Sequence, residues 1–373
     1  MTDSSTSTRS VPETAADALR STVVGSEAFA KRHLDFEPGF FRRTTFGITV
    51  SSLGIGTYLG ESTDADDEAY QRSVTHAIES GVNLIDTAIN YRSQRSERAV
   101  GAAIEHVVGS AIARRDEITV CSKAGYIPFE LTPPATREEY KEYVRRSFVE
   151  PRILHGDDIV AGGHSLAPRF LKYCLAKSRQ NLGVRTIDVF YLHNPGQQLS
   201  AVSRDEFKAR LKLAFVALEE ATVRGEIGVY GCATWDELRV SPDTKGHVSL
   251  EELVSIAREV AGADHHFRAV QLPINFAMTE AVRVPTQPLD GNLVSAVMAA
   301  EALGLTVFAS ASLLQARLTS GLPPALGDAF PGCTTDAQRA LAFVRALPGV
   351  TAALVGTKTE AHVDENLAPA RLR

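Results

Sequence analysis

The chain has 373 residues, 44% of them apolar, and a formal net charge of −6 at neutral pH. This size allows one large α/β barrel with additions or two domains, and the acidic balance argues against a nucleic-acid partner. No apolar run is long enough to cross a membrane, residues 1–10 lack the apolar core of a signal peptide, and the four cysteines form no Cys-x-x-Cys pair. We therefore expect a cytoplasmic protein with no membrane partner.

The beginning of the chain predicts an extension outside the main domain. Residues 1–40 are polar at first and then mixed, so we expect this segment to be partly disordered at its start. Within it, residues 15–19 and 29–33 are candidates for short helices. The main domain is expected over residues 41–373.

The main domain opens with a hairpin and a glycine-rich strand. Residues 41–50 predict a small hairpin with Gly47 at its turn, and residues 53–58 predict the strand. The Gly-Ile-Gly-Thr-Tyr-Leu-Gly run at residues 54–60 is one residue too long for the Gly-x-Gly-x-x-Gly dinucleotide fingerprint, and acidic residues that would repel phosphate follow it. We therefore reject a Rossmann fold and attribute these glycines to close approach of the backbone.

Short apolar runs then alternate with stretches of helical period to the end of the chain. This alternation predicts a (β/α)8 TIM barrel. The predicted strands are residues 53–58, 82–86, 118–123, 187–193, 228–233, 267–272, 305–309 and 350–356. The predicted helices are residues 66–79, 95–107, 165–181, 204–224, 251–261, 293–303, 334–347 and 362–367.

One connection is far longer than the others. Residues 124–163 form an insertion after the third predicted strand, whereas such loops usually have about 2–6 residues. It contains four prolines and a predicted helix at residues 137–148. It could be inert surface decoration, but loops at this end of a barrel strand open on the active face. We therefore favour a lid or wall, with Tyr126 and Phe129 as apolar contacts for a substrate.

Chemically useful side chains recur where predicted strands end. Asp86, Lys123 and His193 each close an apolar strand, and Tyr91 follows Asp86 by five residues. Taken alone, Asp86 and Tyr91 would be a helix cap and a surface residue. The carboxyl ends of parallel barrel strands share one face, so we expect all four side chains to converge there.

These residues belong to motifs through which the chain resembles an aldo-keto reductase. The motifs follow the family's order and span about residues 43–367. They are Ser-Leu-Gly-Ile-Gly-Thr at residues 52–57, Asn-Leu-Ile-Asp-Thr-Ala at residues 83–88 with Tyr91, Ser122-Lys123, Leu192-His193, Gln271 with Asn275, and Gly-Thr-Lys at residues 356–358 with Glu365-Asn366.

The resemblance implies a proton relay for carbonyl chemistry. A phenol with a pKa of about 10 donates a proton poorly at neutral pH, and a neighbouring ammonium lowers that pKa. Tyr91 would be the acid, Lys123 and Asp86 its tuners, and His193 the group that orients the substrate oxygen. The substrate would be a small carbonyl or alcohol molecule.

The resemblance further implies that the hairpin at residues 41–50 closes the barrel floor, and that a nicotinamide cofactor lies across the barrel mouth. We expect this cofactor to be NADP (NADPH) in preference to NAD. Two positions depart from the family pattern: Ala233-Thr234 stands in place of Ser-Asn, and Ser310 stands where an aromatic residue often lies. The expected cofactor contacts are Gly56, Thr57, Thr234, Gln271, Ser310, Leu313, Gln315, Gly356, Thr357, Lys358, His362, Glu365 and Asn366.

The preference for NADP rests on the last of these segments. Lys358, between the hydroxyls of Thr357 and Thr359 at the expected start of a helix, could bind the 2′-phosphate. Thr357 could instead be a plain helix cap. His362 stands where the family commonly has Arg or Gln, so we expect a modest preference.

Three functions are compatible with these residues. The favoured one is a nicotinamide-dependent reductase of aldehydes or ketones, or the reverse oxidation. Lys123 could instead form a Schiff base in a lyase, although a lyase needs no phosphate site. The third is a non-catalytic nicotinamide sensor. No metal is expected, because the adjacent His265 and His266 point apart and lack a third ligand. The sequence indicates neither the substrate nor the oligomeric state.

Overall fold

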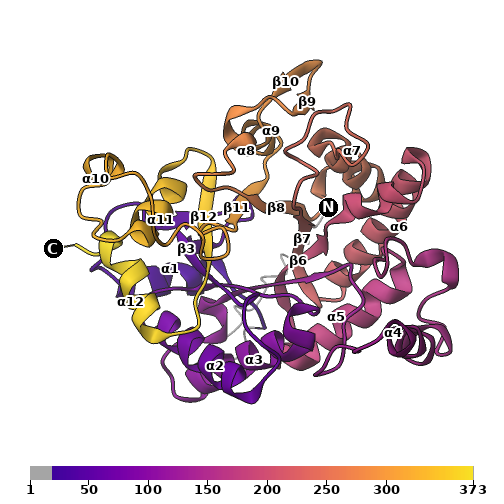
Figure 1. Ribbon diagram of the computed structural model, residues 1–373, viewed down its shortest axis with the longest axis horizontal. Coiled ribbons are helices and arrows are strands. Elements are labelled where there is room, and N and C mark those ends of the chain that lie inside the picture. Colours follow the sequence, from indigo (N-terminus) through magenta and orange to yellow (C-terminus); the bar gives the residue numbers. More distant parts are fainter. Residues whose placement is uncertain (1–18, 373) are drawn as a thin grey trace, which may run out of the picture.

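The computed structural model describes residues 19–372, and a closed barrel of parallel strands lies at its centre (Figure 1). The order of the strands around the barrel is β11-β12-β3-β4-β5-β6-β7-β8, which confirms the predicted (β/α)8 fold. Their bounds are β3 (Leu53–Gly56), β4 (Leu84–Asp86), β5 (Thr119–Ala124), β6 (Ile187–His193), β7 (Ile227–Ala233), β8 (Phe267–Pro273), β11 (Thr306–Ser310) and β12 (Val350–Gly356).

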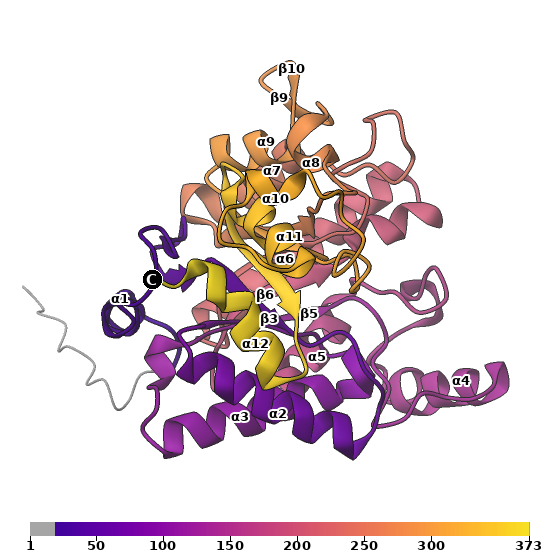
Figure 2. The ribbon, with the colours of Figure 1, turned by 60° about the vertical axis from the view of Figure 1, so that its left-hand side comes forward.

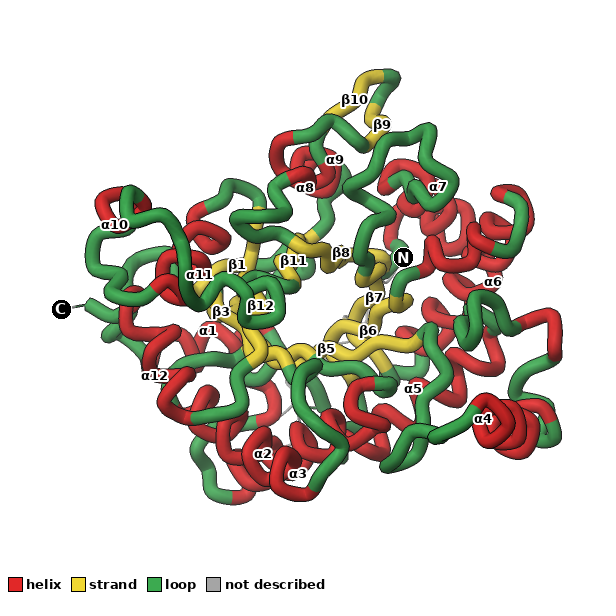
Figure 3. The backbone as a smooth tube through the Cα atoms, viewed as in Figure 1, coloured by secondary structure: helices red, strands yellow, loops and turns green. Residues whose placement is uncertain are grey.

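Helices surround the barrel and cover its outer face (Figure 3). Several begin at a Ser or Thr whose side chain accepts a backbone N–H of the first turn, as Thr63 and Ser203 do. The helices that follow the barrel strands are α2 (Asp64–Glu79), α3 (Arg95–Gly109), α5 (Pro168–Leu182), α6 (Arg204–Val223), α7 (Leu250–Ala261), α9 (Ala296–Ala302), α11 (Asp336–Ala346) and α12 (Glu360–Leu367). No helix within residues 19–372 is long and apolar enough to span a bilayer.

The barrel interior is a packed apolar core, and a hairpin closes it at the amino ends of the strands. Gly54 lies inside it, and a Cβ there would approach side-chain atoms of Leu354 and Leu84 to within 3 Å, so this glycine permits close packing of side chains and not the expected close approach of the backbone. The predicted floor hairpin is confirmed as β1 (Phe41–Arg43) and β2 (Thr49–Ser51), with Gly47 at φ +91° in its turn. Ile48 and Val50 of the hairpin join the interior cluster.

Within residues 19–40, the described part of the segment before the hairpin, there is one helix, α1 (Val23–Arg32). It replaces the short helix predicted at residues 29–33, and it begins at Thr22, whose hydroxyl accepts the Gly25 N–H. Arg32 ties it to the barrel through Glu117, with 2.7 Å between Nη2 and Oε2. The other predicted helix, at residues 15–19, and the polar start of the chain lie almost wholly outside the described residues.

A second hairpin and two short helices were not predicted. β9 (Gln287–Leu289) and β10 (Asn292–Val294) pair antiparallel around Asp290 and Gly291, both with positive φ. Helix α9 therefore starts at Ala296 and not at residue 293. The short helices are α8 (Glu280–Arg283) and α10 (Leu326–Ala329).

The insertion lies mainly at the periphery. Its helix α4 (Arg137–Val144) projects outward beside α5, away from the barrel centre (Figures 1 and 2). A wide turn over Arg145–Val149 follows, and the fully buried ring of Phe148 packs edge-on against Phe170 of α5 at 5.8 Å. Only the two ends of the insertion approach the mouth of the barrel, where Tyr126 pairs with His164.

Candidate active site

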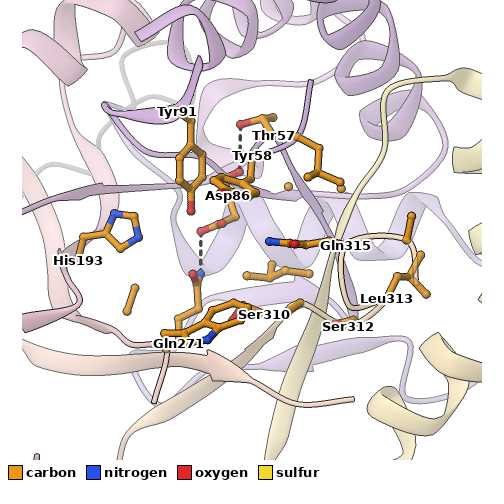
Figure 4. Close-up of a pocket in the computed structure, with 18 of the residues that line it drawn as sticks. Thr57, Tyr58, Asp86, Tyr91, His193, Gln271, Ser310, Ser312, Leu313 and Gln315 are labelled. Carbon is orange, nitrogen blue, oxygen red and sulfur yellow. Dashed lines mark hydrogen bonds between the residues drawn. The ribbon is translucent and has the colours of Figure 1, made fainter. Parts of the chain in front are cut away.

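A cavity of about 750 Å³ opens at the carboxyl ends of the barrel strands. Tyr91 and His193 lie on one side of it, and Ser312, Leu313 and Gln315 lie on the other (Figure 4). Asp86 lies at its base, and Lys123 lies directly behind Asp86. The structure therefore brings together the four side chains that the strand ends predicted.

A buried ion pair forms the base of the cavity. Lys123, with no exposed surface, places Nζ 2.7 Å from Asp86 Oδ2 and also donates to the Thr87 carbonyl at 2.8 Å. Asp86 Oδ1 accepts the amide of Gln271 at 2.8 Å, so both carboxylate oxygens are engaged. Burial lowers the pKa of Lys123, but Asp86 and Tyr91 outweigh that effect and raise it overall. Lys123 is therefore an ammonium at neutral pH.

Tyr91 faces this ion pair from the loop after β4. Lys123 Nζ lies 4.8 Å from the centroid of the Tyr91 ring, and Tyr58 packs edge-on against that ring at 5.0 Å. Burial raises the pKa of the Tyr91 phenol, and the charge of Lys123 opposes the shift without cancelling it. The net direction is the opposite of the one expected from the ammonium alone, so Tyr91 is a protonated phenol at neutral pH.

The loop that carries Tyr91 has a strained backbone that its neighbours hold in place. Arg92, Ser93 and Gln94 all have positive φ, at +47°, +56° and +70°. The buried guanidinium of Arg92 donates to the Glu61 carbonyl at 2.8 Å and to the Asp67 carboxylate. Such a conformation costs free energy, and the contacts of Arg92 offset that cost. They therefore hold the loop, and with it Tyr91, in one position.

His193 completes this side of the cavity as a neutral imidazole. Its ring lies edge-on to Tyr91 at 5.9 Å and to Tyr126 at 5.1 Å. Burial, with the charge of Lys123, lowers the pKa of His193 well below its ordinary value. Its Nδ1 is buried and has no hydrogen-bond partner within residues 19–372.

Most of the expected cofactor contacts line the same cavity. They are Gly56, Thr57, Thr234, Gln271, Ser310, Leu313, Gln315, Gly356, His362, Glu365 and Asn366.

Two of the expected contacts, Thr357 and Lys358, do not line it. Thr357 is buried and its hydroxyl accepts Asn366 Nδ2 at 3.3 Å. Lys358 Nζ lies 2.8 Å from Asp66 Oδ1 of α2, and this contact holds the pKa of Asp66 below its usual value. Thr359 caps α12, so Thr357 is not the helix cap and Lys358 precedes the helix. The sequence could not reveal the partner of Lys358, because the two residues are 292 positions apart.

Comparison with known proteins identifies the family. The model of the aldo/keto reductase family matches residues 52–242. The chain belongs to the aldo/keto reductase family.

Individual relatives of this aldo/keto reductase match parts of the chain. A D-threo-aldose 1-dehydrogenase from Pseudomonas sp is 29% identical over 189 residues, 50% of this chain and 50% of that protein. A chloroplastic pyridoxal reductase from Arabidopsis thaliana is 33% identical over 96 residues, 23% of this chain and 26% of that protein. The chain thus spans about half the length of the first of these curated relatives and about a quarter of the second.

A solved structure shows the same fold over most of the chain. The crystal structure of an aldo/keto reductase from Klebsiella pneumoniae, in complex with NADP and acetate, superposes with a TM-score of 0.58. The match covers 90% of each chain at 18% identity.

Several residues that line the cavity of this aldo/keto reductase were not predicted. Tyr58, Asn90, Asn194 and Trp235 lie on loops just after strands, where no periodicity distinguishes an inward side chain from an outward one. Their one common signal is that each follows a barrel strand by a few residues.

Of the insertion, Tyr126 alone lines the cavity. The expectation for Phe129 is wrong, because its ring packs against Tyr140 and Tyr143 within the insertion.

Proposed function

We propose that this aldo/keto reductase is a nicotinamide-dependent oxidoreductase that reduces an aldehyde or ketone to an alcohol, or catalyses the reverse oxidation. The observation that carries the proposal is the Tyr91 phenol beside the buried Asp86–Lys123 pair, with His193 on the same side of one cavity. Carbonyl reduction needs a proton donor held next to the reacting oxygen, and Tyr91 is the phenol of this cavity that lies against the Lys123 ammonium.

The cavity suits a nicotinamide cofactor. Asn90 Oδ1 is buried without a hydrogen-bond partner in the described residues, although Asn90 lines the cavity. Gln271 donates its amide to Asp86, which leaves Oε1 to accept an N–H of a carboxamide. When bound, the cofactor supplies or accepts a hydride. A polar series from Gln271 through Ser310 and Gln315 to Asn366 would hold it along the mouth.

The side chains of the protein then complete the reduction. His193 donates to the carbonyl oxygen and fixes its orientation. As hydride adds to the carbonyl carbon, the proton of the Tyr91 hydroxyl passes to the oxygen, and the alcohol forms. The phenolate left on Tyr91 is stabilised by Lys123, whose charge Asp86 holds in place. Solvent returns a proton to Tyr91, and oxidation of an alcohol follows the same path in reverse.

NADPH is the proposed cofactor, with NAD as the alternative. A neighbour in structure is an aldo/keto reductase in complex with NADP. In this chain, Lys358 follows Gly356 and Thr357 at the expected phosphate end, and it is paired with Asp66. We infer that binding of the 2′-phosphate requires Lys358 to leave Asp66, which reduces the preference.

The environment of Lys123 counts against a Schiff-base lyase. A lysine nucleophile must be neutral and able to reach a carbonyl, whereas this one is fully buried and held charged by Asp86. The presence of all four side chains also favours turnover over a non-catalytic sensor.

The lining of the cavity indicates a small polar substrate. Tyr58, Tyr126 and Trp235 offer aromatic faces, and Asn90 and Asn194 offer amides. Aldoses and pyridoxal combine an oxygenated or heteroaromatic body with a carbonyl, and the relatives named above are a D-threo-aldose 1-dehydrogenase and a pyridoxal reductase. We propose that the substrate belongs to this class of compact polar carbonyls.

A substrate panel tests the proposed function. The full chain is assayed with NADPH and NADH against simple aldehydes, ketones, aldoses and pyridoxal, by the absorbance of the reduced nicotinamide. Turnover of at least one compound is expected. Cofactor binding with no turnover across the panel would favour the sensor, and covalent trapping of a carbonyl on Lys123 by borohydride would favour the lyase.

A further inference from the structure

A second buried histidine, His164, contacts the backbone of His193 from outside the cavity. His164 directly follows the insertion and has no exposed surface. Its Nε2 lies 2.8 Å from the carbonyl oxygen of His193, and its Nδ1 lies 2.8 Å from Nε2 of Gln198. A carbonyl oxygen only accepts, so the His164 ring must donate from Nε2.

The neighbours of Gln198 fix the direction of each hydrogen bond in this series of side chains. Arg210 Nη1, which can only donate, lies 2.9 Å from Gln198 Oε1, so the opposite end of the amide is its NH2 group. That NH2 donates to His164 Nδ1. Burial lowers the pKa of His164 to about 4, which is consistent with one proton on Nε2. The series of hydrogen bonds therefore runs from Arg210 through Gln198 and His164 to the carbonyl of His193.

The absence of a side chain at Gly125 leaves space for the contact between His164 and His193. A Cβ on Gly125 would lie 2.6 Å from the His193 carbonyl oxygen and 2.9 Å from His164 Nε2, so any larger residue would block the hydrogen bond. The two ends of the insertion also fix the position of His164. The Ile127 N–H donates to the Gly163 carbonyl at 2.8 Å, and the Ser165 N–H donates to the Gly125 carbonyl at 2.7 Å.

His193 has few other restraints. Its Nδ1 makes no hydrogen bond within the described residues, so its ring is held by aromatic contacts with Tyr91 and Tyr126 and by its backbone. Tyr126 in turn packs edge-on between the two imidazoles, 5.0 Å from His164 and 5.1 Å from His193. The end of β6 that carries the ring is held by the backbone bond from the Asn194 N–H to the Ala233 carbonyl at 2.6 Å, and the His164 hydrogen bond adds a side-chain restraint to it.

We propose that His164 is a positioning residue for His193, and that the insertion acts on turnover through its base and not as a lid. The inference rests on the proposed function, in which His193 orients the substrate oxygen. A displacement of about 1 Å in such a group can cost about 10²-fold in rate.

Two substitutions of His164 separate positioning from packing. In His164→Gln the terminal amide can take the place of Nε2 and keep the donor to His193. In His164→Asn the shorter amide takes the place of Nδ1, keeps Gln198 and loses His193. We expect kcat of the Asn variant to fall about 10- to 100-fold, with the cofactor Kd unchanged, and the Gln variant to recover most of this loss.

His247 provides a matched control. It is also buried, and its Nε2 lies 2.8 Å from the Thr286 carbonyl, but it does not line the cavity. His247→Asn removes a similar contact and should lower stability while leaving kcat near that of the wild type. In a His193→Phe background, His164→Asn should cause no further loss of kcat, because its effect passes through the missing ring.

Three results would overturn the proposal: wild-type kcat in His164→Asn, equal losses in the Asn and Gln variants, or losses from His164→Asn and His193→Phe that multiply. Absence of turnover by the wild type would instead count against the proposed function. Crystal structures then decide the inference separately, since an unmoved His193 ring in His164→Asn contradicts it and a displaced ring supports it.

Discussion

The central residues of this site are a charged pair removed from water. Lys123 has no exposed surface and Asp86 is 6% exposed, so each charge depends on the other. Breaking a buried pair by removing one partner typically costs about 3–5 kcal/mol, because an uncompensated charge is left behind.

Asp86→Asn should therefore lower the free energy of unfolding by about 3–5 kcal/mol, as measured by urea denaturation. Combining it with Lys123→Met removes the stranded charge and should restore part of the loss. Unfolding curves that coincide for the wild type and Asp86→Asn would show that the pair contributes nothing to stability.

The protonation states of Tyr91 and His193 predict a pH profile. The donor is the neutral phenol, so reduction is fastest below the pKa of Tyr91 and slows as pH rises through it. That pKa lies above the ordinary value of about 10. His193 is already neutral, because its pKa is lowered. We expect kcat for reduction to stay level from pH 6 to about 9, and a titration in kcat near 6.5 would contradict these assignments.

Lys358 and Asp66 predict the cofactor preference. Lys358→Ala should weaken NADPH binding roughly 10- to 100-fold and leave NADH binding unchanged, because a hydrogen bond to a charged group contributes about 1.5–3 kcal/mol. Asp66→Asn frees Lys358 from its partner and should tighten NADPH alone. Dissociation constants for both cofactors decide this prediction. If Lys358→Ala weakens both equally, or Asp66→Asn has no effect on NADPH, the lysine does not bind the phosphate.

At the scale of elements, the long insertion has separable parts. Helix α4 of the insertion lies at the periphery, and Tyr126 is the one residue of the insertion that lines the cavity. The sequence predicted the position of the insertion, after the third barrel strand and at the carboxyl end of the barrel. It did not show which ring turns inward, because Tyr126 and Phe129 are both aromatic and differ only in tertiary contacts. The hairpin of β9 and β10 was not predicted for another reason: its strands have three residues each, too few to show alternation around the Asp290-Gly291 turn, and the predicted helix at residues 293–303 overlaps β10.

The two residues of the insertion that were expected to contact a substrate, Tyr126 and Phe129, predict different kinetic effects. Tyr126→Phe removes a hydroxyl that accepts Asn194 Nδ2 at 3.0 Å, and should change KM for polar substrates about 2- to 10-fold, as expected for one hydrogen bond. Phe129→Leu, away from the cavity, should leave KM unchanged across the panel. A larger change in KM from Phe129→Leu than from Tyr126→Phe would reverse this assignment.

For the whole molecule, the sequence predicted the barrel because strand and helix periods alternate in a regular order. It also predicted the residues at strand ends, since barrel geometry brings those ends together. It did not predict contacts between distant loops, such as Lys358 with Asp66 or His164 with His193. Nor did it predict that burial would outweigh Lys123 in setting the pKa of Tyr91. Those outcomes depend on how completely the folded loops exclude water.

Substitution of Tyr91 tests whether its phenol is the proton donor. Tyr91→Phe removes the proton donor and keeps the ring that packs against Lys123 and Tyr58. Single-turnover reduction of the best substrate should slow about 10²- to 10⁴-fold, while the Kd for NADPH stays near that of the wild type. A Phe variant that reduces the substrate at the wild-type rate would show that Tyr91 is not the acid.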